Sequence, residues 1–244
     1  MIDLVISTHP DADHINGLKR LMEQTTGRKL MIHRPRLHVA NVSDFSNIEA
    51  VDDLIKLATQ PGIPIVEPFQ GAQEFDGQLT VLGPTEEYYI ALVKQHLEEE
   101  ATGKGADRRS QADRAFALAR RVLDNVLSWM PMETLDDEDE ISPRNDSSAI
   151  VLLEVDGRRL LFTGDAGITA LGRAADYYEY VHLGSFNGYP LSFFQAPHHG
   201  SKHNLGPTIL NRILGQRGQP YGDLISFISS AKTGATDVPV GTCS

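Results

Sequence analysis

The chain has 244 residues with 33 acidic and 22 basic side chains, and its net charge is −11 with neutral histidines. An acidic balance repels polyanions at long range, so it excludes a broad nucleic-acid-binding surface but not a small basic patch beside a metal. The single cysteine, Cys243, excludes a disulfide framework and a thiolate metal site, which fits a reducing compartment. Because no apolar run approaches membrane-spanning length, we expect a cytoplasmic protein without a membrane segment.

Short apolar runs and segments of helical periodicity alternate along the N-terminal part of the chain. The apolar runs predict strands at residues 2–7, 29–33, 63–66 and 78–82. Apolar side chains three and four positions apart predict helices over 15–22 and 48–58. Ser46 and Glu49 form a capping-box pattern at the start of the second helix.

The alternation stops between residues 86 and 144. Residues 88–100 are helical in composition, residues 115–127 carry an apolar stripe of helical period, and residues 136–140 form an acidic run. We interpret 86–144 as a helical insertion that an exposed acidic linker ties back to the fold. The whole chain, 1–244, is expected to form a single domain around it.

After the insertion, strand signals return. Two apolar runs, 149–155 and 158–163, flank Asp156-Gly157, which is the strongest hairpin signal in the sequence. Together with the alternating first part, this pattern is typical of a mixed α/β (α+β) protein.

The most informative motif is the run of His9, Asp11, Asp13 and His14, which follows an apolar strand and opens a helix. Borderline divalent metals take imidazole nitrogen and carboxylate oxygen together, and four such donors on one loop can supply two adjacent ions. The alternative is a polar turn in which one Asp caps the helix. A cap needs one of these residues and not four, so we interpret all four as metal ligands.

Two more apolar runs end in possible ligands. Asp165 follows a strand and is flanked by Gly164, so its carboxylate is placed to bridge two ions, although Gly-Asp is also a common turn. Further on, a strand runs into His198 and His199. Adjacent side chains point in different directions, so we expect one histidine to bind metal and the other to meet substrate or support the ligands.

The residues after these histidines and the segment before the hairpin offer polar groups. Ser201 and Lys202 are placed to donate to an anionic group, and the alternative is a histidine-rich surface loop without function. The segment 144–148, which contains Asn145, consists largely of turn formers. A structural turn and a functional loop are equally good interpretations of it.

Taken in order, four segments resemble the metallo-β-lactamase superfamily of metallo-hydrolases. Within it they are most similar to the hydrolase domain of the bacterial DNA-uptake channel protein ComEC and its stand-alone relatives. The segments are 7–18, 145–153, 161–165 and 196–201. The resemblance implies an αββα four-layer sandwich with the metal site at one edge. Since the chain has one strand before the first motif where the family has a strand pair, we expect the sandwich to lack N-terminal strands.

The resemblance also implies which residues hold metal. His9 and Asp11 would bind a first divalent ion, Asp165 would bridge, and the second ion would be held by Asp13, His14 and His198. Most members carry one more metal-binding histidine where this chain has residues 144–146, which offer no imidazole. The donor set is then richer in oxygen, which favours Mn²⁺ as an occupant beside Zn²⁺.

These residues predict a metal-dependent hydrolase, with a phosphodiesterase or nuclease activity favoured. A hydroxide shared by the two ions would attack a small phosphodiester or single-stranded nucleic acid. The residues assigned to catalysis are Asp13, Asp165, His199 and Ser201, and those assigned to substrate binding are Asn145, Ser201 and Lys202. Two alternatives stay open: hydrolysis of a lactam, lactone or thioester, and a non-catalytic metal-binding regulatory module. The sequence identifies no partner protein.

Overall fold

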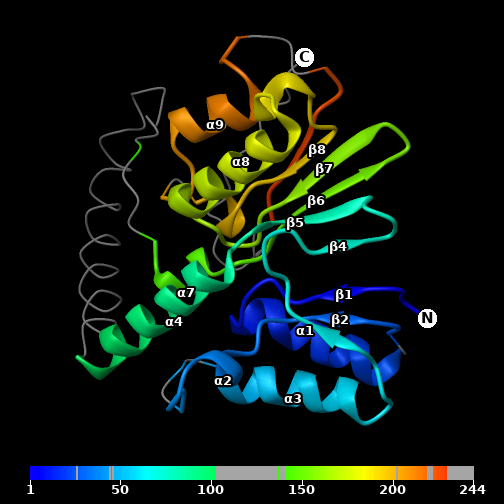
Figure 1. Cartoon of the computed structure of the whole chain (residues 1–244), viewed down its shortest axis with the longest axis vertical. Helices are drawn as coiled ribbons and strands as arrows, with labels where there is room; N and C mark the ends of the chain where they lie inside the picture. Colours follow the sequence, from blue (N-terminus) through cyan, green and yellow to red (C-terminus); the bar gives the residue numbers. More distant parts are fainter. Residues whose placement is uncertain are drawn as a thin grey trace, which may run out of the picture.

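The computed structural model describes residues 1–25, 27–43, 45, 47–102, 137, 141–201, 203–218 and 222–229. The described part is a mixed α/β fold in which two sheets lie against each other (Figure 1). Helices pack on the outer face of each sheet, as Figure 1 shows. No helix within these described ranges combines the length and the apolar composition needed to cross a membrane.

The smaller sheet is parallel and has the strand order β1-β2-β3. Its strands are β1 (Val5–Ile6), β2 (Leu30–Met31) and β3 (Ile65–Val66). Parallel neighbours require a crossover connection, and the helices α1 (Ala12–Gln24) and α3 (Ile48–Thr59) supply the two crossovers. Both helices bury one apolar stripe against the sheet, with Ile15 and Leu54 fully buried.

The larger sheet is mixed and has the order β4-β5-β6-β7-β8-β9. Strands β4 to β7 are antiparallel to their neighbours, and β7, β8 and β9 run parallel. The strands are β4 (Gln73–Glu74), β5 (Leu79–Gly83), β6 (Ile150–Val155), β7 (Arg158–Phe162), β8 (Phe193–Gln195) and β9 (Ile225–Phe227). The predicted hairpin is confirmed: Asp156 and Gly157 join β6 to β7, both with the positive φ that a type I′ turn requires.

The order of the layers follows from which side chains each core contains. The core between the sheets includes Met31 from β2 with Val81 and Val151 from the larger sheet. Leu30, one position before Met31, packs on the opposite face of its sheet against α1 and α3, because successive side chains of a strand alternate. The outer face of the larger sheet is covered by the two helices α8 (Ile168–His182) and α9 (Pro207–Leu214).

The other helices of the described residues lie at one edge of the two sheets (Figure 1). They are α2 (Pro35–His38), α4 (Glu86–Ala101) and α7 (Pro143–Asp146), with short 3₁₀ turns η2 (Phe186–Gly188) and η3 (His198–Gly200) further along. The backbone N–H of Ala149 donates to the carbonyl of Thr8, which ties the loop after β1 to the start of β6. One hydrogen bond thus joins the two sheets beside the candidate site.

Most predicted elements are confirmed, with different ends. The helix predicted over 48–58 begins at Ile48, after Asn47 in a left-handed conformation whose side chain makes no capping hydrogen bond. Ser46, the other half of the predicted capping box, lies outside the described residues. The helix predicted over 88–100 is α4, whereas the predicted helix over 115–127 also lies outside the described part of the chain.

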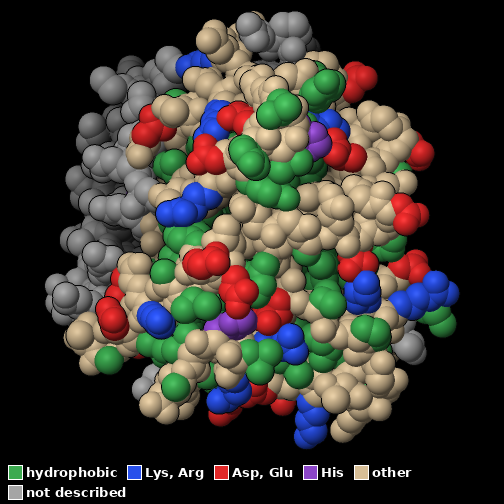
Figure 2. Space-filling model, viewed as in Figure 1, with side chains coloured by type: hydrophobic (Ala, Val, Ile, Leu, Met, Phe, Trp, Pro, Cys, Tyr) green, Lys and Arg blue, Asp and Glu red, His purple; other side chains and the backbone are tan. Residues whose placement is uncertain are grey.

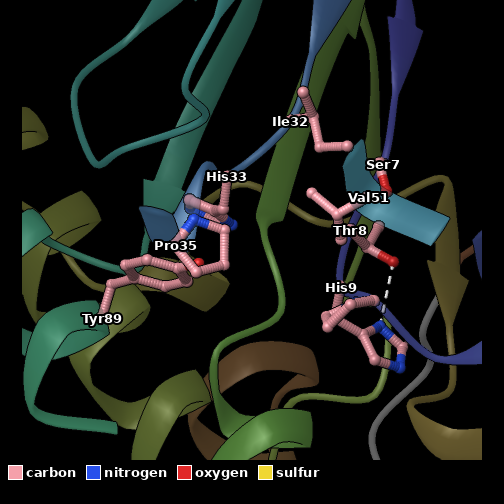
Figure 3. A pocket seen from close by; sticks show the side chains of 9 residues that line it. Ser7, Thr8, His9, Ile32, His33, Pro35, Val51 and Tyr89 are labelled. Atoms are coloured by element: carbon pink, nitrogen blue, oxygen red, sulfur yellow. Dashed lines mark hydrogen bonds between the residues drawn. The ribbon is translucent and has the colours of Figure 1, made fainter. Parts of the chain in front are cut away.

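A histidine that the sequence patterns did not single out lies just after β2. The imidazole of His33 is buried and stacks on the ring of Tyr89, with 4.3 Å between ring centroids. Burial lowers the pKa of His33 to about 3, although a hydrogen bond to the Pro68 carbonyl works in the other direction. His33 and Tyr89 line one side of a small pocket, and Thr8 and His9 line the other (Figure 3).

We predict that His33 makes the protein less stable in mild acid. Below pH 6.5 an unfolded chain protonates this histidine while the folded chain does not, so the free energy of unfolding falls as the pH decreases towards 3. The slope from one such group is at most about 1.4 kcal/mol per pH unit. His33→Asn retains a side-chain hydrogen-bond donor but cannot be protonated in this pH range. Urea unfolding of this variant between pH 7 and 4 should therefore show a smaller change in the free energy of unfolding per pH unit. His182→Asn, a substitution of an exposed histidine, is the control; equal slopes for His33→Asn and the unsubstituted protein would contradict the prediction.

Candidate metal centre

Three loops far apart in the sequence meet at one edge of the sheets. The loop after β1 supplies His9 and the start of α1 supplies His14. Asp165 follows β7, and His198 follows β8. Because β7 and β8 are parallel neighbours, their carboxyl ends lie side by side, and the Gly164 carbonyl accepts a hydrogen bond from the backbone N–H of His198. The fold therefore brings together the three segments that the sequence singled out.

Asp165 is the centre of this group. Its carboxylate is 3% exposed and contacts three imidazoles. Oδ1 lies 3.2 Å from His14 Nε2, whereas Oδ2 lies 3.5 Å from His9 Nε2 and 2.5 Å from His198 Nδ1. Burial by itself raises the pKa of Asp165, but the three neighbouring imidazoles outweigh it and hold the pKa far below its ordinary value.

The backbone around Asp165 is held by two polar residues that sequence reasoning did not assign to the site. Ser148 Oγ accepts a hydrogen bond from the Asp165 N–H, and Asn204 Nδ2 donates to the Asp165 carbonyl at 2.8 Å. Both residues are fully buried. A serine in a turn-forming segment and an isolated asparagine carry no pattern of their own, so only the folded arrangement reveals this role.

The nitrogen atoms that face Asp165 are available for a cation. Nε2 of His9 and Nε2 of His14 are buried, and neither makes a hydrogen bond with the described residues. Nδ1 of His9 lies 3.1 Å from Thr8 Oγ1 (Figure 3), and donation of its proton there leaves the lone pair on Nε2. Buried polar atoms without a partner are costly, so these two atoms fit a metal ion that binds between them and Asp165.

Two groups of three side chains have ligand atoms within 4.8 Å of one another in the described part of the chain. One consists of His9, His14 and Asp165, and the other of Asp13, His14 and His199. Burial lowers the affinity of His14 for a proton, but the carboxylates of Asp165 and Asp13 more than compensate, so the pKa of His14 is raised. The imidazole of His14 belongs to both groups and lies between them.

His199 closes the second group from the loop after β8. Its Nε2 lies 3.0 Å from Asp13 Oδ2, and its Nδ1 lies 2.7 Å from the Ser229 carbonyl. Burial raises the pKa of Asp13, but the hydrogen bond from His199 and the charge of His14 lower it further, so the net shift is downward. Both side chains are partly exposed, which places them at the rim of the site.

The backbone that presents the two histidines is strained. His198 and His199 have φ values of 46° and 55°, and Gly200 follows with 79°. The left-handed region costs a non-glycine residue about 1–2 kcal/mol. Such strain persists where the surrounding structure holds it, and it concentrates at functional sites. Here it turns both rings towards the carboxylates, His198 to Asp165 and His199 to Asp13.

Asp11, which the resemblance predicts as a metal ligand, contacts Arg144. Arg144 Nε lies 2.5 Å from Asp11 Oδ1, and Arg144 Nη2 lies 3.1 Å from Asp11 Oδ2. Asp11 is the N-cap residue of α1, yet its side chain makes no capping hydrogen bond. It belongs to neither of the two possible metal-binding groups among the described residues. No local sequence pattern predicted this pair, because the two residues are 133 positions apart.

The residues predicted to bind substrate are placed as follows. Asn145 Nδ2 lies 3.1 Å from His198 Nδ1, so the amide contacts the site directly. Ser201 Oγ accepts a hydrogen bond from the N–H of His203 within its own loop. Lys202 lies outside the described residues.

No family model matches the chain, and no curated protein matches it significantly. The resemblance to the metallo-β-lactamase superfamily therefore stays a prediction, and the functional proposal depends on the arrangement of these side chains.

We predict that Gly164 is essential for the position of Asp165. Its φ is +55°, and an added Cβ would lie 3.0 Å from Ser148 Cβ and 3.1 Å from Thr8 Cβ. Gly164→Ala should therefore lower the free energy of unfolding by about 2–5 kcal/mol, from backbone strain and overpacking together. Gly157→Ala is a matched control, because Gly157 also has positive φ but no atom near its Cβ position. Urea denaturation of both variants tests this, and equal losses would show that the close approach has no effect.

Proposed function

We propose that the protein is a metal-dependent hydrolase. The observation that carries this proposal is the pair of buried Nε2 atoms, on His9 and His14, which face the Asp165 carboxylate and make no hydrogen bond to any residue that the structure describes. Two imidazoles with one carboxylate are a ligand set found in catalytic zinc sites, which keep one position open. A bound divalent ion would supply Lewis acidity and a water molecule of lowered pKa.

The residues of the candidate site form a buried part and an exposed part. Asp165 and His9 are buried, so they would hold a divalent ion and orient what binds to it. Asp13 and His199 form the exposed rim, with side chains that are 58% and 40% exposed. A carboxylate and an imidazole in contact there are suited to move a proton to or from a bound substrate. The rim is thus the side from which we propose that substrate enters.

A phosphodiester is the favoured substrate class. The resemblance stated above points to it, and the order of layers, helices outside and two sheets inside, supports that resemblance. On the face that Figure 2 shows, Lys and Arg side chains are scattered among Asp and Glu and form no continuous stripe over the described residues. Scattered charge and a net charge of −11 favour a small phosphodiester over a long nucleic acid.

We expect removal of a metal ligand to abolish phosphodiester hydrolysis. His9→Ala and Asp165→Asn should each reduce kcat/KM on bis-nitrophenyl phosphate with Zn²⁺ or Mn²⁺ by at least about 100-fold, because each removes an atom that the ion needs. His182→Ala is the control, since His182 is exposed on α8 away from these contacts. Circular dichroism of each variant verifies folding.

The same assay distinguishes the other functions. Unchanged turnover in both ligand variants would refute the proposal. Cleavage of nitrocefin or an acyl lactone, with bis-nitrophenyl phosphate intact, would replace it with carbonyl hydrolysis. Bound metal without turnover of any ester would identify a regulatory module instead.

A further inference from the structure

We propose that the Arg144 guanidinium takes the place of one of two metal ions, so that the site holds a single divalent ion on His9, His14 and Asp165. The resemblance implies two ions with Asp11 as a ligand of the first. In the structure Asp11 binds a cation that is part of the chain. This inference rests on the metal-dependent function proposed above and specifies its cofactor.

Arg144 and Asp11 form a close ion pair. Arg144 Nη2 donates a hydrogen bond to Asp11 Oδ2 at 3.1 Å, and Arg144 Nε lies 2.5 Å from Asp11 Oδ1, so both carboxylate oxygens face the guanidinium. Both side chains are shielded from water, with 8% of Arg144 and 17% of Asp11 exposed. The pairing also draws the Asp11 carboxylate away from the capping position that an N-terminal Asp ordinarily takes. The chain itself thus supplies the positive charge that the Asp11 carboxylate contacts.

The remaining ligands limit the number of ions that the site can hold. His14 is common to both possible groups, and Nε2 is the atom that it directs at both Asp165, 3.2 Å away, and Asp13, 3.7 Å away. An imidazole nitrogen has one lone pair and binds one ion. The two groups are therefore alternative descriptions of one position around His14, with Asp13 and His199 on its exposed side.

The charges of the cluster balance with one divalent ion. Asp11, Asp13 and Asp165 bring three negative charges, and Arg144 with one divalent ion brings three positive charges. A second divalent ion would leave the cluster with an excess of two positive charges, in a site where burial makes an uncompensated charge costly. One ion and one guanidinium therefore neutralise the group.

This assignment also changes the expected metal. Without Asp11 the ligands are two imidazoles and one carboxylate, which is richer in nitrogen than the set that the sequence implied. Such a set suits Zn²⁺ better than Mn²⁺, which prefers oxygen ligands.

The test is the metal content of the folded protein rather than its turnover. The protein and its variants are dialysed against excess Zn²⁺, then against buffer, and the bound zinc per chain is measured by mass spectrometry. We expect one zinc in the unsubstituted protein and none in Asp165→Asn. The double variant Asp11→Asn/Arg144→Gln removes both charges of the pair together and should still bind one zinc, with a Kd within about tenfold of the original value. Arg144→His should bind a second zinc.

A matched control removes another partly buried pair, with Glu179→Gln and Arg212→Gln, whose atoms are 2.5 Å apart on α8 and α9. It should bind one zinc. Two zinc ions in the unsubstituted protein, or the loss of an ion in the Asp11/Arg144 double variant, would overturn the inference even if Arg144→His does not fold. One bound zinc without hydrolysis would refute the proposed enzyme activity and leave the inference intact, so the two failures are distinguishable.

Discussion

The rest of the site depends on one buried carboxylate, that of Asp165. It lies between His14 on one oxygen and His9 with His198 on the other, and water has little access to it. Taking a carboxylate out of water is costly unless positive charge or hydrogen-bond donors replace the water. Two of the imidazoles come from the segment between β1 and the start of α1 and the third from the loop after β8, so this carboxylate fixes their positions relative to one another.

The fold supplies what this arrangement needs. Parallel pairing of β7 and β8 sets the Asp165 and His198 loops side by side, and the bond from Ala149 to Thr8 brings the β1 loop to them from the other sheet. Ser148 and Asn204 then hold the backbone of Asp165 from both sides. Buried backbone hydrogen bonds thus position the site. They also hold the histidine loop in its strained left-handed conformation.

Local patterns in the sequence predicted much of this arrangement. The hairpin at Asp156-Gly157 follows from residues that tolerate positive φ, and the grouping of Asp165 with His9 and His14 follows from donors placed directly after strands. The pairing of Asp11 with Arg144 was not predicted from these patterns, because the two residues are 133 positions apart. Only the tertiary structure decides whether such a carboxylate contacts a metal or a guanidinium. The same limitation applies to Asn204, since a single buried polar residue produces no periodic signal.

A guanidinium within a group of carboxylates determines whether the metal site can form before an ion binds. Neighbouring carboxylates repel one another until a cation binds, so metal binding and folding are coupled in sites that lack another positive charge. In this chain Arg144 neutralises Asp11 permanently, and the histidines around Asp165 stabilise its charge. The pocket can therefore be structured before any ion arrives, and the ion meets ligands that are already oriented. Pre-organised ligands lower the entropic cost of metal binding, and this favours a site that binds one exchangeable ion.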